Sequence, residues 1–104
     1  MAFRSISAAV ETSAWAKFWG LMFKSEITPL IFKFESEQYV PLHSFFVGAP
    51  IDVLFLDESK KVVEIKVNFE PYSFYHPKLK AKYVVELPAG NGKGIRIGDT
   101  IRFK

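Results

Sequence analysis

The hydrophobic and polar residues of this chain alternate over several short segments, a pattern typical of β-strands with one face on a core. Leu30, Phe32 and Phe34 are separated by single residues, which predicts a strand that ends at the turn-forming residues 36–38. The most regular alternation covers residues 61–70 and predicts a continuous strand there. Apolar positions are expected on one face of it and polar positions on the other: Val63, Ile65, Val67 and Phe69 against Glu64, Lys66, Asn68 and Glu70.

Other segments extend this pattern. Residues 51–56 are nearly all apolar, which favours a strand that is covered on both faces. The turn-forming residues 57–60 then link it to the next strand as a hairpin. Further strands are expected at residues 3–10, 39–47, 83–87 and 100–104, the last with Ile101 and Phe103 pointing inward.

One segment near the N-terminus follows the period of a helix instead. Four apolar residues recur there at the spacing of one helix stripe, namely Trp15, Phe18, Trp19 and Met22. Thr12 or Ser13 supplies an N-cap oxygen, and Gly20 favours a C-terminal end. The sequence therefore predicts a single domain, residues 1–104, that is mainly β with one short N-terminal helix. We expect about six to eight strands in a compact rolled or barrel-like antiparallel sheet.

The amino-acid composition of the chain excludes several classes of function. The 104 residues contain no cysteine and 2 histidines, which excludes thiol chemistry, disulfides and an all-histidine metal cage. No apolar run reaches the ~18 residues of a membrane span, and no cleavable leader is evident, so the expected compartment is the cytoplasm. We therefore expect no membrane partner, no metal and no other cofactor. The net charge of +3 is small for a nucleic-acid-binding protein, so nucleic acid is an unfavoured partner.

Asp52 is the most informative polar residue, because on an extended strand it shares a face with Leu54 and Leu56. A carboxylate among apolar side chains needs hydrogen-bond donors, so we expect a structural anchor for nearby backbone amides. The alternative is a general acid or base, with His43 brought beside it by a hairpin or Glu86 as a second carboxylate. The catalytic candidates are thus His43, Asp52 and Glu86.

Two loops could hold a ligand. Residues 71–77 place aromatic rings between two prolines, and such rings either stack on sugars and bases or cap a core. Residues 89–94 contain three glycines, lack the phosphate-loop pattern and are expected to form a flexible connection. The candidate ligand-binding residues are Tyr72, Phe74, Tyr75, His76 and Asn91.

Four short motifs follow one another along most of the chain. They are Gly-Leu-Met-Phe-Lys at residues 20–24, Pro-Ile-Asp-Val-Leu-Phe-Leu-Asp at 50–57, Tyr-Val-Val-Glu-Leu-Pro-Ala-Gly at 83–90 and Gly-Asp at 98–99. In order and spacing they resemble the family of domain of unknown function 192, or uncharacterised protein family 0127. Residues 43–47 stand where bacterial members carry Trp-Met-Lys-Asn-Thr, so the chain is more similar to the archaeal branch. The resemblance implies a compact β-rich domain with no established activity.

Together these observations favour a non-enzymatic module that binds a small ligand or a protein partner, as a monomer or homodimer. Its site is expected on the surface between the aromatic loop, the glycine-rich loop and His43. A hydrolase-like enzyme that uses a His–carboxylate pair is the first alternative. A binder of polyanions or single-stranded nucleic acid is the second.

Overall fold

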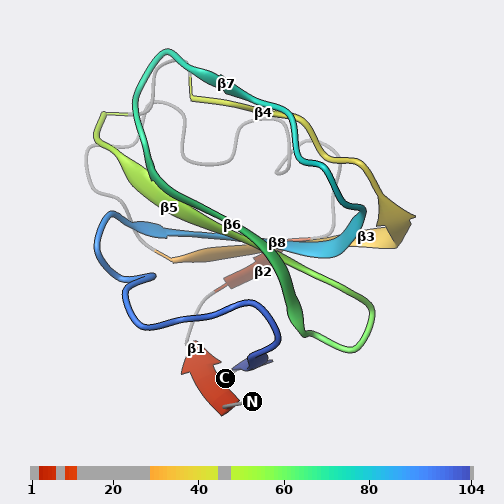
Figure 1. Ribbon diagram of the computed structural model, residues 1–104. Helices are drawn as coiled ribbons and strands as arrows, with labels where there is room; N and C mark the ends of the chain where they lie inside the picture. The colour runs from red at the N-terminus through yellow and green to blue at the C-terminus, as the bar shows by residue number, and fades with distance from the viewer. Residues whose placement is uncertain (1–2, 7–8, 12–28, 45–47, 104) are drawn as a thin grey trace.

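The computed structural model describes residues 3–6, 9–11, 29–44 and 48–103, and these form a mainly β structure (Figure 1). The predicted N-terminal helix lies outside the described residues. Five strands form the central sheet in the order β2-β3-β8-β5-β6. Their bounds are Ala9–Glu11 for β2, Leu30–Gln38 for β3, Ala81–Pro88 for β8, Ile51–Leu56 for β5 and Val62–Phe69 for β6.

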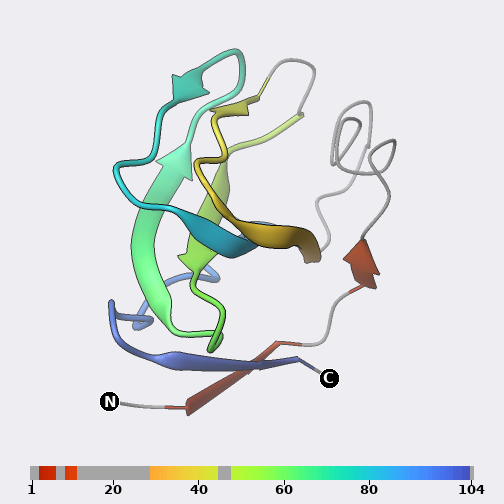
Figure 2. The same cartoon turned by 90° about the vertical axis from the view of Figure 1, so that its right-hand side faces the viewer.

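Two small strand pairs lie on opposite sides of this sheet (Figure 2). One pair is β4 (Leu42–His43) with β7 (Phe74–Tyr75), and the other is β1 (Phe3–Ile6) with β9 (Thr100–Phe103). In Figure 2 the first pair is at the top of the molecule and the second at the bottom, near both chain termini. The sheet is therefore covered on both faces by short extended segments.

A hydrophobic cluster fills each of the two spaces. We call the cluster under β4 and β7 the upper core: Leu30, Phe32, Ile51, Val53, Phe55, Phe69, Ala81 and Val84. We call the cluster facing β1 and β9 the lower core: Ile6, Ile31, Leu54, Leu56, Val62, Tyr83, Val85, Leu87 and Ile101. Successive residues of β5 alternate between the two cores, so the predicted strand covered on both faces is confirmed, with all six residues buried.

The strand β6 departs from the regular alternation that the sequence predicts. Its register against β5 shifts twice. The neighbours Leu56 and Phe55 pair with Val62 and Glu64, which are two residues apart. Val53 and Ile51, two residues apart, pair with Lys66 and Phe69, which are three residues apart. Each shift adds one residue to β6, as a β-bulge does, and reverses which face the next side chains occupy. The predicted faces of this strand are therefore wrong: Val63 and Phe69 contact the upper core, Ile65 contacts the lower core, and Val67 is 56% exposed.

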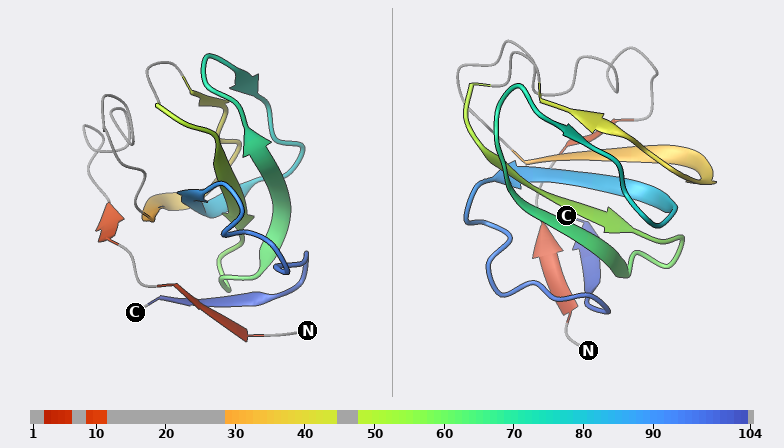
Figure 3. Two further views of the ribbon diagram at one scale, coloured as in Figure 1. Left: turned by 90° about the vertical axis from the view of Figure 1, so that its left-hand side faces the viewer. Right: turned by 45° about the horizontal axis from the view of Figure 1, so that its top comes forward.

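The sheet is not a closed barrel, because its order begins at β2 and ends at β6 without pairing these strands. Antiparallel pairing joins β3, β8, β5 and β6, as expected, whereas β2 runs parallel to β3 and β1 runs parallel to β9. The predicted single strand at residues 3–10 is instead divided between two sheets. Within the described residues the chain forms nine strands, whereas about six to eight were expected. Figure 3 shows their arrangement from two further sides.

The second register shift of β6 supplies a prediction about Asn68, which has a positive φ of 50°. A residue with a Cβ is strained there, but Asn tolerates this conformation better than most and Gly adopts it freely. We expect the free energy of unfolding of Asn68→Ala to be about 1 kcal/mol lower than that of Asn68→Gly. Both variants lose the Asn68 side chain, so the glycine variant controls for its bond to Glu70. Equal stabilities in chemical denaturation would contradict the backbone explanation.

Candidate functional site

The carboxylate of Asp52 joins three segments of the chain. Its side chain lies on the lower-core face of β5, as predicted, and the residue is 2% exposed. Its Oδ1 accepts a hydrogen bond from the Asn68 amide at 2.9 Å, and its Oδ2 accepts bonds from the Gly90 and Gly92 amides at 2.9 Å each. A Cβ at residue 92 would lie 3.0 Å from Oδ2, so glycine is needed where the loop approaches the carboxylate.

These bonds are the ones that the anchor interpretation of Asp52 expects, and they favour it over the catalytic alternative. Both carboxylate oxygens accept hydrogen bonds from backbone amides, as buried polar groups generally do. The two residues that the catalytic alternative places beside Asp52, His43 and Glu86, lie elsewhere in the fold. Glu86 pairs with Val53 and therefore lies on the opposite, upper-core face of the sheet. His43 is exposed on β4, across from Phe74. The structure does not bring His43 or Glu86 to Asp52.

A second anchor, which the sequence interpretation missed, fixes the aromatic loop. Ser44 is buried, and its hydroxyl donates to the carbonyl of Glu70 and accepts from the Ser73 amide at 2.9 Å. The Ser44 backbone bonds to Ser73 and Tyr72 at 3.0 Å each. Tyr72 is held at a φ of 60°, an unfavourable value for an aromatic residue. Ser44 thus determines how the loop crosses the sheet.

The aromatic ligand-binding candidates divide between surface and core. Tyr72 and Phe74 are each 66% exposed, and His76 is exposed as well. Tyr75 instead packs on the upper core, with its ring centroid 5.9 Å from that of Phe55. Tyr75 thus faces the opposite side of its strand from Phe74, because successive side chains of a strand alternate between its faces.

The buried carboxylate of Glu64 is a third anchor. The sequence placed Glu64 on the polar face of its strand, but the first bulge of β6 turns it toward the upper core. It accepts hydrogen bonds from the amides of Lys78 at 2.9 Å and Leu79 at 3.0 Å, and from the hydroxyl of Tyr75. The hydrogen bond to Glu64, with burial and the negative charge of Glu64 as further causes, raises the pKa of Tyr75 to about 12.

A pocket of about 360 Å³ opens on the other side of the molecule, where β1 meets the glycine-rich loop. Its lining residues are Arg4, Ser5, Ile6, Pro29, Leu87, Asn91, Lys93 and Ile95. Asn91 is thus a ligand-binding candidate that lines this pocket. It is far from the aromatic loop in the fold, because Asp52 holds the glycine-rich loop on the lower-core face while Ser44 holds the aromatic loop over the upper core.

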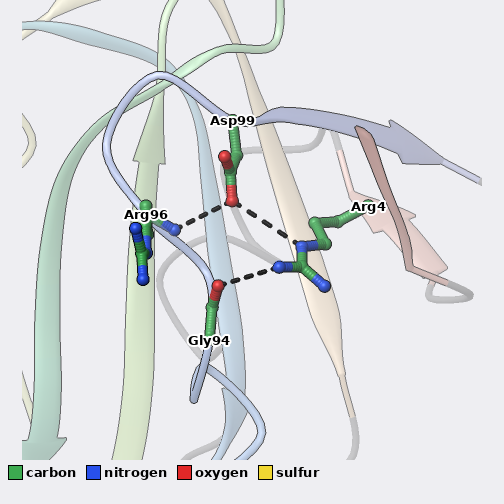
Figure 4. A network of polar contacts seen from close by, with 4 residues as sticks. All are labelled: Arg4, Gly94, Arg96 and Asp99. Carbon is green, nitrogen blue, oxygen red and sulfur yellow. Dashed lines mark hydrogen bonds and ion pairs between the residues drawn. The ribbon is translucent and has the colours of Figure 1, made fainter. Parts of the chain in front are cut away.

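Arg4, which lines this pocket, belongs to a small network of polar contacts (Figure 4). Its Nη2 donates to the carbonyl of Gly94 at 3.0 Å, and its Nε lies 3.7 Å from Oδ2 of Asp99. The same Oδ2 accepts the Arg96 amide at 2.9 Å, so Asp99 links its own turn to β1. Arg4 was not predicted as a site residue, because its position depends on the parallel pairing of β1 with β9 near the opposite end of the chain.

The described residues contain no group of three or more His, Asp or Glu side chains arranged to hold a metal ion. They also contain no helix that is long and apolar enough to cross a membrane. The polar side chains that the fold does bring together are anchors for backbone amides and the pocket residues around Arg4.

The fold and site together define a small, mainly β domain whose loops are held by buried polar side chains and whose described residues line a pocket beside β1. The sequence matches the profile of DUF192, described as uncharacterized ACR, over residues 1–103, and the chain belongs to this family. It is similar to the UPF0127 proteins of Pyrococcus furiosus and Pyrococcus horikoshii. Identity to the first is 37% over 91 residues, covering 84% of this chain and 78% of the relative. Identity to the second is 36% over 88 residues, covering 81% and 76%.

Two crystal structures share the fold. One is a candidate transcription regulator from Sinorhizobium meliloti 1021, with a TM-score of 0.82 and 23% identity over 88% of this chain and 76% of that chain. The other is a protein of unknown function from Novosphingobium aromaticivorans, with a TM-score of 0.79 and 23% identity over 92% and 71%. The resemblance stated from the sequence motifs is thus confirmed, including the archaeal type of the chain.

Because the Asp52 carboxylate accepts three backbone amides, we expect its replacement by a side-chain amide to destabilise the fold. Asp52→Asn keeps one acceptor oxygen but presents an NH₂ group to amide donors, so we expect a loss of about 2–4 kcal/mol in the free energy of unfolding. Asp57→Asn is the matched control. Asp57 accepts the Ser59 and Lys61 amides through Oδ1 alone, which an Asn oxygen can replace, so its loss should stay below about 1 kcal/mol. Similar losses for both variants in urea denaturation would overturn the role given to Asp52.

The raised pKa of Tyr75 predicts a fall in stability at high pH. The folded state keeps this proton up to a pH of about 12, whereas an unfolded tyrosine loses it near its ordinary pKa of 10.0. The contribution is therefore complete below pH 10, and it is lost as the pH rises to about 12. Tyr75→Phe should lack this component of the fall, on the order of 2 kcal/mol, whereas the exposed Tyr39→Phe should retain it. Parallel pH profiles for wild type and Tyr75→Phe would refute it.

Proposed function

We propose that this protein is a non-enzymatic module that binds a small organic molecule in the pocket between β1 and the glycine-rich loop. The observation that carries the proposal is the lining of this pocket. Its inner part contains the buried side chains of Ile6 and Leu87, and its rim contains Arg4, Asn91 and Lys93. Ligand sites in proteins commonly combine an apolar interior with a few polar groups in this way, and the volume of about 360 Å³ suits a small molecule.

The catalytic alternative has less support. A hydrolase needs a base, its orienting carboxylate and a reacting atom within hydrogen-bond reach of one another. Asp52 bonds to backbone amides, Glu86 lies on the opposite face of the sheet, and His43 lies on β4. None of these three residues lines the pocket. Binding without turnover is therefore the function that the described geometry supports best.

The walls of the pocket suit binding because they are held before a ligand arrives. Asp52 fixes two amides of the glycine-rich loop, and the Arg4 side chain is bonded to the Gly94 carbonyl. A site that is already ordered loses less conformational entropy when it binds a ligand. The same contacts would also transmit ligand binding to the stability of the whole domain, because they tie the loop to β5 and β1.

A thermal-shift screen tests this proposal. Sugars, nucleotides, short carboxylic acids, amines, amides, divalent metals and oligonucleotides would be screened with the whole chain. A ligand at about 100 times its dissociation constant adds roughly 2.7 kcal/mol to the free energy of unfolding. Each kcal/mol raises the melting temperature of a domain of this size by about 4–8 °C. We expect at least one small organic hit, and a screen in which none raises the melting temperature would contradict the proposal.

A pair of isoleucine variants assigns the hit to the pocket. Ile95 lines the pocket, so Ile95→Trp should fill it and abolish the thermal shift. Ile97 lies two residues further along, is 68% exposed and does not line the pocket, so Ile97→Trp is the matched control. Retention of the shift by Ile95→Trp would place the ligand elsewhere and overturn the assignment.

A further inference from the structure

We propose, resting on the function proposed above, that the pocket selects a small anion: a carboxylate or phosphate group attached to a short apolar body. The lining residues, all within the described part of the chain, include two charged side chains, Arg4 and Lys93, and both are cationic. No carboxylate is among these lining residues. Asp99, which is not among these lining residues, pairs with Arg4 and offsets one of the two positive charges. The remaining positive charge would attract an anion.

The guanidinium of Arg4 is oriented by two contacts. The Gly94 carbonyl holds Nη2 at 3.0 Å, which fixes the plane of the group. Its Nε forms an ion pair at 3.7 Å with Oδ2 of Asp99, which also accepts the Arg96 amide. The Arg4 side chain is 47% exposed, so its charge is accessible to a ligand. A guanidinium held in this way is suited to planar carboxylates and to phosphates, which it can bind through two parallel bonds.

The glycine-rich loop adds a second cation and a polar amide to the same rim. Asn91 and Lys93 alternate with Gly90 and Gly92, whose amides bond to Asp52. The loop therefore presents these two side chains from a backbone that is held in place. Because Arg4 comes from β1 and Lys93 from this loop, the two cations reach the pocket from different segments of the chain.

The apolar part of the lining argues for a body as well as a charged head. Ile6 and Leu87 are 9% and 3% exposed, and Ile95 packs against the lower core beside them. An inorganic anion would bind at the rim and leave this surface unused. A short alkyl chain would cover it and contribute about 0.8 kcal/mol for each buried methylene group.

Four probes of similar size separate charge from shape: hexanoate, hexyl phosphate, hexanamide and hexylamine. Each would be titrated into the isotope-labelled chain at low ionic strength, and amide NMR shifts of the pocket residues would be followed. We expect hexanoate or hexyl phosphate to bind at least about tenfold more tightly than hexanamide, as a charged hydrogen bond allows. Hexylamine should bind most weakly. The preferred head among the first two distinguishes a carboxylate ligand from a phosphate ligand.

Variants identify the cations responsible. Arg4→Gln and Lys93→Gln should each weaken binding of the preferred anion by about fivefold or more and leave hexanamide binding unchanged. Lys33→Gln is the matched control, because Lys33 is an exposed lysine on β3 that does not line the pocket. The Lys93 variant keeps the inference testable if Arg4→Gln disturbs the pairing of β1 with β9.

The outcomes separate this inference from the function on which it rests. Equal binding of hexanoate and hexanamide at the pocket would overturn the anion inference and leave the small-molecule function standing. Equal weakening by Lys33→Gln would show a general charge effect and would also overturn it. If no anionic probe shifts the pocket resonances, the anion inference fails, and the thermal-shift screen with neutral and cationic compounds decides the broader function separately.

Discussion

The hydrogen bonds from three backbone amides to the carboxylate of Asp52 are the constraint on which the rest of this structure depends. An unpaired carboxylate beside the lower core would cost several kcal/mol, so the chain must bring donors to it. They come from the end of β6 and from the glycine-rich loop, which fixes both relative to β5. The loop in turn forms one wall of the pocket, so a buried charge on the central strand determines the shape of a surface feature.

The opposite face follows the same physical rule with different residues. Ser44 and Glu64 are buried, and each accepts amide bonds from the segment that crosses the upper core. A small sheet with short covering strands has few ladder bonds to hold its connections, since the β4–β7 pair is two residues long. Buried side-chain oxygens therefore accept hydrogen bonds from backbone amides that strand pairing does not satisfy. Chemistry-bearing residues are therefore used here mainly for folding.

Sequence patterns predicted the parts of the fold that depend on local periodicity. The strand at Ile51–Leu56, the start of β3 and the burial of Asp52 follow from which neighbours are apolar. The turn predicted at residues 36–38 is wrong, because β3 continues to Gln38. The faces of β6 could not be predicted, because bulges break the two-residue period without changing composition. Glu64 was missed for that reason, and Ser44 because a lone serine carries no distinctive pattern. Arg4 was missed because parallel pairing joins residues almost a full chain length apart.

The distinction between anchors and pocket residues also explains why the catalytic candidates do not line the pocket. Asp52 attracts notice because it is a charge in an apolar strand, yet burial against three amides uses the hydrogen-bond capacity that catalysis would need. Residues that remain able to meet a ligand lie on exposed or half-exposed positions whose sequence context is unremarkable, such as Arg4 and Lys93. In a domain this small the buried polar groups are engaged by the fold itself. Ligand recognition is then expected at the edge of the anchored network, where the same bonds hold a side chain in place and leave it exposed to a ligand.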